Sequence, residues 1–334
     1  MRKPNYTGQD LPITHNTYHN GKLVRQEDGT MNLQPTWGGR AGLLETLKQR
    51  ELPNNLGKGA LVLTQMGEAP SGLTVIYGMG WGGNEYTEVA QQEMAEIAHT
   101  LRDKDGKMPT IVTTPTSALR EPIAHKIAKE GSFAALAEEV APGVDRVAAD
   151  SDEIVVLGNS YGARLGAAMP AALAERQKIT ELVLEDPPSS CWSLGKLGIA
   201  VAQGIEAINM QRYIKNSYDV AAREAWDHVK DAPEIARPPL AVQLKDISAM
   251  AQTTGFNLDL LSAVGSLPEG APITLVSPEL SRMNRKGDAA NLMQSVSELY
   301  PKANLRVAEI GDSAHNVVAG NPAYFGKILE LGHK

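Results

Sequence analysis

The sequence predicts an α/β fold: a mostly parallel central sheet with helices on both faces, plus an inserted helical cap. Two observations carry this prediction. Apolar runs of strand type alternate with helical patterns over residues 57–188 and again over residues 269–334, and such alternation favours a parallel sheet. Between them, in residues 189–268, strand patterns disappear and helical patterns dominate. An insertion at this point is expected to cover the carboxyl edge of the sheet, where ligands bind in such folds.

Residues 1–56 are interpreted as an N-terminal arm that precedes the core. The first part is polar and carries turn formers such as Asn20-Gly21, which favour a small hairpin or an irregular segment. His15 and His19 lie in this arm. No third candidate ligand accompanies them, so solvated side chains are favoured over a metal site.

The core strands are expected at short runs rich in Val, Ile and Leu. These runs are 61–65, 73–77, 110–114, 153–157, 181–185, 273–277 and 304–309. Helices are expected where apolar residues recur at spacings of three and four, as they do at Ala90, Met94, Ile97 and Leu101. Further helices are expected at 132–149, with an interruption at Pro142-Gly143, and at 163–176, 288–300 and from about 322 onward.

Composition limits the classes of function. The chain has 334 residues, of which 42% are hydrophobic and 21% charged, as is usual for a soluble globular protein. With a net charge of −7 and no basic cluster longer than Arg282–Lys286, a nucleic-acid partner is not expected. The single cysteine, Cys191, has no partner for an internal disulfide. No apolar run is long enough to span a bilayer and no signal sequence is evident, so we expect a cytoplasmic protein.

The pentapeptide Gly158-Asn159-Ser160-Tyr161-Gly162 lies between the apolar run that ends at Leu157 and an Ala-rich helical segment. A G-x-S-x-G sequence between a strand and a helix is typical of a nucleophile elbow. The chain must reverse within a few residues, which strains the backbone of the serine, and the glycines leave no side chain to clash with the neighbouring elements. The pattern therefore predicts an exposed Ser160 hydroxyl beside the N-terminus of a helix.

From about residue 57 to residue 334, the chain resembles an α/β-hydrolase with a helical cap. The resemblance rests on four features in the order of that family: the glycine-rich loop after the strand ending at Tyr77, the elbow at Ser160, an acid late in the chain, and His315 before the last helix. It implies that Ser160 is a nucleophile and that His315, in the loop Gly311–His315, is the base that takes its proton.

The carboxylate that would orient His315 is left open between two residues. In the family it usually follows the strand expected at 273–277, where Glu279 is the nearby carboxylate. In some members it follows the strand after the elbow helix, and that position is Asp186. Asp288 and Asp312 are less favoured alternatives. The family pattern also implies an oxyanion hole formed by the backbone amides of Met79 and Tyr161.

Two other functions are weighed against hydrolysis. The loop Gly78–Gly83 also fits the dinucleotide-binding pattern G-x-G-x-x-G, but the strand that follows ends without the acidic residue that this fingerprint expects. Scaffolds of this kind also host acyl transfer and non-catalytic proteins. The sequence contains no H-E-x-x-H motif and no Cys/His cluster, so neither a metal nor another cofactor is expected. The prediction is a serine hydrolase that cleaves a carboxylic ester or thioester of a small, apolar substrate through an acyl-enzyme.

Overall fold

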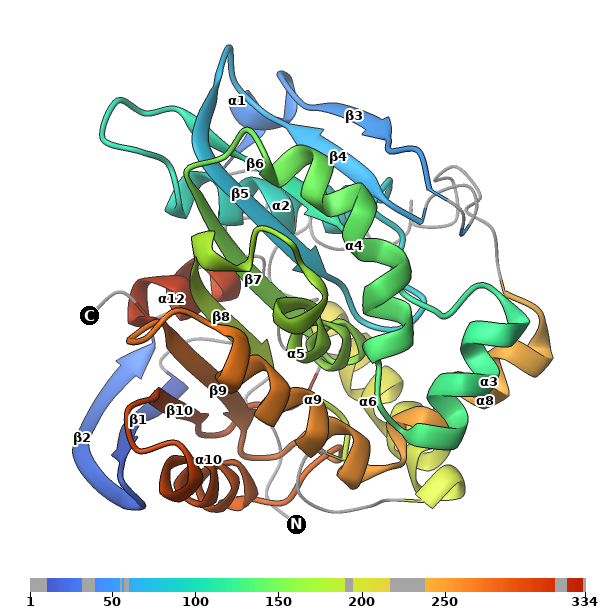
Figure 1. The fold of residues 1–334 in the computed structure, drawn as a ribbon, viewed down its shortest axis with the longest axis vertical. Coiled ribbons are helices and arrows are strands. Elements are labelled where there is room, and N and C mark those ends of the chain that lie inside the picture. The colour runs from blue at the N-terminus through green and yellow to red at the C-terminus, as the bar shows by residue number, and fades with distance from the viewer. Residues whose placement is uncertain are drawn as a thin grey trace.

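The computed structural model describes residues 11–31, 40–54, 56, 60–189, 195–216, 238–315 and 323–332. In these residues a ten-stranded sheet has the order β2-β1-β10-β9-β8-β7-β5-β6-β4-β3 (Figure 1). The six strands from β10 to β6 are parallel to their neighbours, and the strands at both edges are antiparallel. The predicted mostly parallel sheet is confirmed.

The strands lie at β1 (Leu11–His19), β2 (Lys22–Met31), β3 (Lys48–Glu51), β4 (Val62–Gln65), β5 (Pro70–Gly78), β6 (Met108–Thr113), β7 (Glu153–Asn159), β8 (Ile179–Glu185), β9 (Pro272–Pro278) and β10 (Asn304–Ile310). The helices lie at α1 (Ala41–Leu44), α2 (Glu88–Thr100), α3 (Glu121–Glu130), α4 (Ala134–Ala148), α5 (Tyr161–Ala172), α6 (Gly195–Asn216), α8 (Leu240–Met250), α9 (Thr253–Ser266), α10 (Asp288–Leu299) and α12 (Ala323–Gly332). A short 3₁₀ turn spans Arg176–Lys178.

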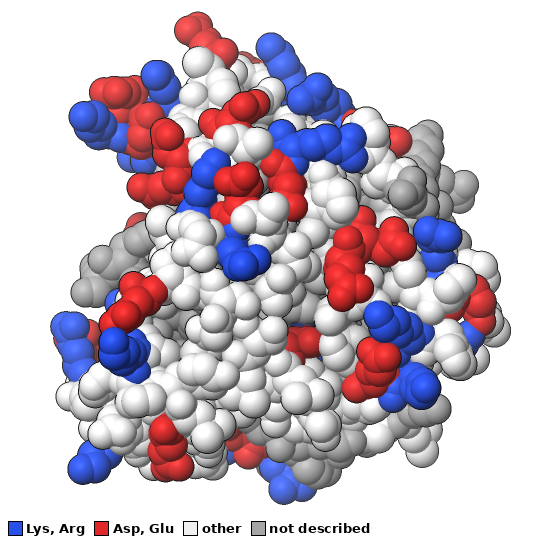
Figure 2. Space-filling view, viewed as in Figure 1, with Lys and Arg blue, Asp and Glu red and all other residues white. Residues whose placement is uncertain are grey.

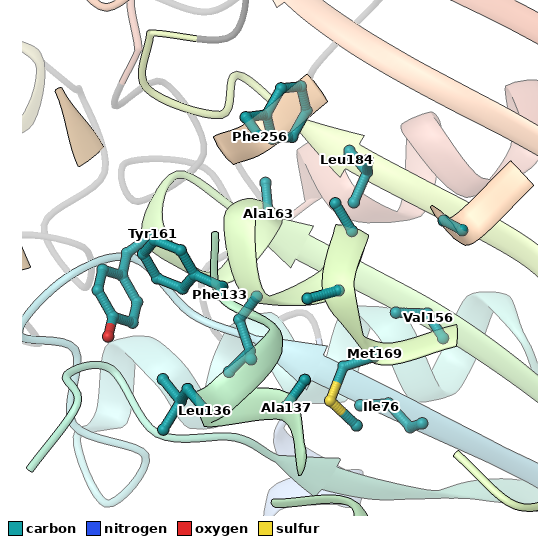
Figure 3. Close-up of a cluster of buried hydrophobic side chains, with 14 of the residues drawn as sticks. Ile76, Phe133, Leu136, Ala137, Val156, Tyr161, Ala163, Met169, Leu184 and Phe256 are labelled. Carbon is teal, nitrogen blue, oxygen red and sulfur yellow. The ribbon is translucent and has the colours of Figure 1, made fainter. Parts of the chain in front are cut away.

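Two apolar clusters lie on the two faces of the sheet, because successive residues of a strand point to opposite faces. In β7, Ile154 and Val156 belong to the cluster that includes α4, α5 and α9, whereas Val155 and Leu157 belong to the cluster that includes α2 and α12. Figure 3 shows part of the first cluster, where side chains from α4 and α5 meet those of the strands. The helical face predicted at Ala90, Met94, Ile97 and Leu101 is confirmed, since all four side chains are buried in the second cluster.

The N-terminal hairpin extends the sheet. β1 and β2 pair around a turn in which Asn20 and Gly21 both have positive φ, 49° and 69°, as a two-residue hairpin turn requires. β1 then pairs antiparallel with β10, so Ile13 lies opposite Ile310. The first part of the predicted N-terminal arm is thus hydrogen-bonded, as strand β1, to the last strand of the core.

The inserted region contains α6, α8 and α9. α8 packs against α3 and α6, whereas α9 packs against α5 (Figure 1). α9 therefore belongs with the helices that cover the sheet, although the sequence placed it in the cap with the rest of residues 189–268.

The expected interruption at Pro142-Gly143 does not occur, because α4 runs through both residues. Gly143 packs closely against Leu61, since a Cβ on Gly143 would lie 2.5 Å from Leu61 Cδ1. Val140 and Val144 of the same helix are buried, and their packing stabilises the helical turn that contains Pro142. Tertiary packing here outweighs the local preference against proline in a helix.

Candidate active site

Ser160 lies in the sharp turn between β7 and α5. Its backbone has φ +54° and ψ −115°, a conformation that costs free energy in a residue with a side chain and that clusters at functional sites. Its backbone N–H donates to the carbonyl of Glu185 at 2.8 Å. This bond fixes the turn to the end of β8.

Three glycines allow β5, β7 and α5 to meet at this turn. A Cβ on Gly162 would lie 2.0 Å from the carbonyl oxygen of Gly78, and a Cβ on Gly158 would lie 2.4 Å from the carbonyl oxygen of Gly162. No real Cβ approaches a backbone oxygen so closely. The glycines of the pentapeptide are therefore required by the close approach of three backbone segments.

His315 lies between Ser160 and Asp186. Its Nε2 is 2.8 Å from Ser160 Oγ, and its Nδ1 is 2.6 Å from Asp186 Oδ2. All three side chains are buried: Ser160 is 4% exposed, His315 2% and Asp186 1%. A hydroxyl, an imidazole and a carboxylate in this chain can move a proton from the hydroxyl to the imidazole while the carboxylate fixes the imidazole tautomer.

Of the two carboxylates that the sequence left open, Asp186 is the one that contacts His315. It follows β8, and its backbone N–H donates to the carbonyl of Val276 at 2.9 Å. Glu279 turns elsewhere: one carboxylate oxygen is 2.7 Å from Lys286 Nζ, and the other accepts from the backbone N–H of Asp312 at 3.1 Å. Glu279 therefore holds the segments after β9 and β10 together.

The segment after β9 nevertheless contributes to this site. Ser281 Oγ donates to Asp186 Oδ2, and Asn284 Nδ2 donates to Asp186 Oδ1 at 2.7 Å. These two bonds orient the carboxylate toward His315. In the sequence, only carboxylates were considered in this turn, and Ser281 and Asn284 were therefore missed. The polar side chains in the turn were the feature that could have indicated them.

The surroundings of His315 raise its pKa, because they stabilise the imidazolium more than burial destabilises it. Burial disfavours the charged imidazolium, but the charge and hydrogen bond of Asp186 outweigh it, and Glu206 of α6 adds to the same effect. The net result is a His315 pKa above its ordinary value of 6.5. The imidazolium is the form that arises when Ser160 gives up its proton, so this environment stabilises it.

The structure also brings the glycine-rich loop after β5 alongside the elbow. Gly78 pairs with Gly158 across neighbouring strands, and a Cβ on Gly80 would lie 3.8 Å from Ser160 Cβ. Met79 is buried next to them. Tyr161 is the first residue of α5, so its N–H has no acceptor within the helix.

The side chain of Tyr161 anchors the elbow in the core. Its ring meets the ring of Phe133 edge to face, with centroids 4.9 Å apart (Figure 3). Its hydroxyl is 3.3 Å from Asp246 Oδ1. The residue after Ser160 is therefore held at both ends, by α5 and by its side chain.

The part of the chain that the structure describes offers no metal site and no membrane span. No group of three His, Cys, Asp or Glu side chains there is placed to hold a metal ion. No helix among the described residues is both long and apolar enough to cross a membrane. On the face shown in Figure 2, basic and acidic side chains are interspersed around a broad area without charged residues.

Comparison with known proteins agrees at the level of the fold. No family model matches the sequence, and no curated protein sequence matches it significantly. Among solved structures, a laboratory-evolved variant of potato epoxide hydrolase is similar, with a TM-score of 0.53, 13% identity, and coverage of 85% of this chain and 98% of that chain. An esterase from Pyrobaculum calidifontis has a TM-score of 0.49 at 14% identity, covering 88% of this chain and 86% of its own. A carboxylesterase from Bacillus subtilis has a TM-score of 0.47 at 11% identity, covering 85% and 90%. The chain has the α/β-hydrolase fold.

Proposed function

We propose that the protein is a serine hydrolase that cleaves carboxylic ester or thioester bonds of a small, apolar substrate. The observation that carries the proposal is the hydrogen-bonded chain from Ser160 through His315 to Asp186. The strained backbone at Ser160, with φ +54° and ψ −115°, supports it independently, because such strain is expected at a nucleophile elbow.

In the proposed reaction, His315 Nε2 removes the proton of Ser160 as Oγ attacks the carbonyl carbon of the ester. Asp186 stabilises the imidazolium that results, and His315 then protonates the leaving alcohol or thiol. Water, deprotonated by His315, attacks the carbonyl carbon of the acyl-enzyme. The bond from this carbon to Ser160 Oγ then breaks, His315 returns the proton to Oγ, and the carboxylic acid is released. The backbone N–H groups of Met79 and Tyr161 are the proposed donors to the oxyanion in both steps.

Replacement of the nucleophile tests the proposal. Ser160→Ala should abolish hydrolysis of p-nitrophenyl esters and labelling by a fluorophosphonate probe, whereas the control Ser295→Ala, on the exposed face of α10, should keep both. A panel of acyl chains from two to sixteen carbons or so would define the substrate class. If the unmutated protein neither labels nor hydrolyses any ester or thioester, the hydrolase proposal fails.

The role of the acid has its own test. Asp186→Asn should lower kcat by about 10⁴, because an amide cannot stabilise the imidazolium and favours the wrong tautomer. Glu279→Gln should change kcat by less than about 10-fold, since Glu279 contacts Lys286 and Asp312, and His315 contacts Asp186. Equal losses in the two variants, at equal thermal stability, would contradict the assignment of Asp186.

Two other reactions are weaker candidates. An epoxide hydrolase shares the fold, but that branch of the family uses an aspartate as nucleophile, and this chain has Ser160 at the elbow. A dinucleotide-binding oxidoreductase would leave the contacts among Ser160, His315 and Asp186 without a purpose. Titration with NAD(H) and NADP(H) decides the second case, because micromolar binding would favour it over hydrolysis.

A further inference from the structure

A buried aspartate in the inserted region, Asp246 of α8, is not used by the reaction described above. Its side chain is fully buried. Burial of a carboxylate is costly unless hydrogen-bond donors surround it. Here burial raises the pKa of Asp246 to about 6 despite several such donors.

The donors to Asp246 come from three segments around the elbow. Ser117 Oγ lies 2.5 Å from Oδ2, and the backbone N–H of Ala118 donates to Oδ1 at 3.3 Å. The hydroxyl of Tyr161 donates to Oδ1 at 3.3 Å. The indole N–H of Trp81 donates as well. One carboxylate therefore joins the segment after β6, the residue after the nucleophile and the glycine-rich loop.

Two of these segments carry the proposed oxyanion donors, and the third is bonded to one of those two. Tyr161 carries one proposed oxyanion donor on its backbone, and Trp81 is two residues from Met79, which carries the other. The segment after β6 is itself bound to the loop: Gly82 N–H donates to the carbonyl of Thr116 at 3.4 Å, and Thr116 Oγ1 donates to the carbonyl of Gly83 at 3.1 Å. Asp246 thus contacts both walls of the proposed oxyanion hole and the segment that supports one of them.

We propose that Asp246 is a positioning residue that sets the distance between the two oxyanion donors and so makes catalysis depend on the docking of α8. The proposal rests on the proposed function for its catalytic part. Without Asp246, Trp81 and the Tyr161 hydroxyl lose their common acceptor, and the loop beyond Gly78 is held less tightly against the elbow. Oxyanion stabilisation requires donors aimed to within a few tenths of an ångström, so kcat is the quantity affected.

The simpler reading is that Asp246 only attaches α8 to the core, and two controls separate it from positioning. Lys245→Met removes the ion pair between α8 and Glu121 of α3 and leaves the loop untouched. Asp259→Asn changes another buried aspartate, which binds Ser132 Oγ at 2.5 Å and the backbone N–H of Phe133 at 2.7 Å, away from the loop. Lys245→Met reproduces the weaker attachment of α8, and Asp259→Asn reproduces the loss of a buried carboxylate.

The experiment measures kcat and KM for a p-nitrophenyl ester in Asp246→Asn, Asp246→Leu and both controls. Positioning predicts that kcat falls about 10- to 100-fold in Asp246→Asn and further in Asp246→Leu, with KM within about threefold of wild type. The controls should stay within about threefold in kcat. If the Asp246 variants match the controls, or lose activity through KM alone, the proposal is overturned.

Hydrogen exchange supplies a measurement that does not depend on hydrolysis. Amides in residues 79–83 and 161–164 should exchange at least about 10-fold faster in Asp246→Asn, with exchange in β7 and β8 unchanged and no such acceleration in the controls. Unchanged exchange in the loop overturns the positioning role even where ester turnover is normal. If wild type hydrolyses no ester, the proposed function falls, and the exchange data alone decide whether Asp246 holds the loop and the elbow.

Discussion

A buried carboxyl group behind the elbow should make the stability of this protein fall as pH rises. Glu93 of α2 is 7% exposed, and its Oε2 accepts from the hydroxyl of Tyr77 at 2.9 Å. Burial raises the pKa of Glu93 from the ordinary 4.5 to about 7, and the hydrogen bond from Tyr77 offsets only part of the effect. In the unfolded chain, the same group loses its proton near its ordinary pKa.

The sign and size of the effect follow from proton linkage. Between about pH 4.5 and pH 7 the folded protein holds a proton on Glu93 that the unfolded chain has lost, so stability decreases as pH rises through this range. A pKa difference of about 2.5, at about 1.4 kcal/mol for each unit, corresponds to about 3 kcal/mol lost by pH 8. This is a large share of the stability of an ordinary domain.

Glu93→Gln removes the titration and keeps an acceptor for Tyr77. The buried amide N–H groups cost about 1 kcal/mol, so the variant should be about 1 kcal/mol less stable than wild type at pH 4.5 and about 2 kcal/mol more stable at pH 8. Urea unfolding followed by circular dichroism at both pH values measures the free energy of unfolding. Glu88→Gln, on the exposed side of the same helix, serves as control. If Glu93→Gln and Glu88→Gln show the same change between the two pH values as wild type, the assigned cause is refuted.

Two further substitutions test the packing around the elbow. Gly162→Ala places a methyl group 2.0 Å from the carbonyl oxygen of Gly78, so it should lower the free energy of unfolding by more than about 3 kcal/mol or prevent folding. The control is Gly204→Ala, whose methyl group meets nothing within 4 Å and which should stabilise the protein by up to about 1 kcal/mol. Equal thermal midpoints for the two variants would contradict the packing argument. Arg164→Met removes donors to four backbone carbonyls from a fully buried position, so the urea midpoint should fall by the equivalent of about 3 kcal/mol or more. An unchanged midpoint would show that water replaces these bonds without cost.

Local patterns predicted the elements that depend on neighbours in sequence. The pentapeptide around Ser160 predicted the strained turn, because it lies between a strand pattern and a helix pattern and its glycines allow a sharp reversal there. The spacing of Ala90, Met94 and Ile97 predicted the buried face of α2. Asn20-Gly21 favoured a hairpin, which is one of the two forms left open for that segment.

Contacts between distant segments were beyond the reach of such patterns. Asp186 and Glu279 both follow a strand near the same edge of the sheet. Which of them faces His315 depends on how the turns after β8 and β9 pack, and Asp186 and His315 are 129 positions apart in the sequence. The pairing of β1 with β10 joins opposite ends of the chain for the same reason.

By itself, the sequence predicted the seven core strands and most of the helices between them, the reversal at Ser160 and the candidate base His315, but not α3 or the edge strand β3. The tertiary structure alone decided which carboxylate contacts His315, the donors from Ser281 and Asn284, and the burial of Glu93 and Asp246. In the sequence, Glu93 and Asp246 look like ordinary charged residues on helices. The physical reason is that hydrophobic periodicity is a property of neighbouring residues. The partner that a carboxylate finds, and the solvent that it loses, depend on the whole packed chain.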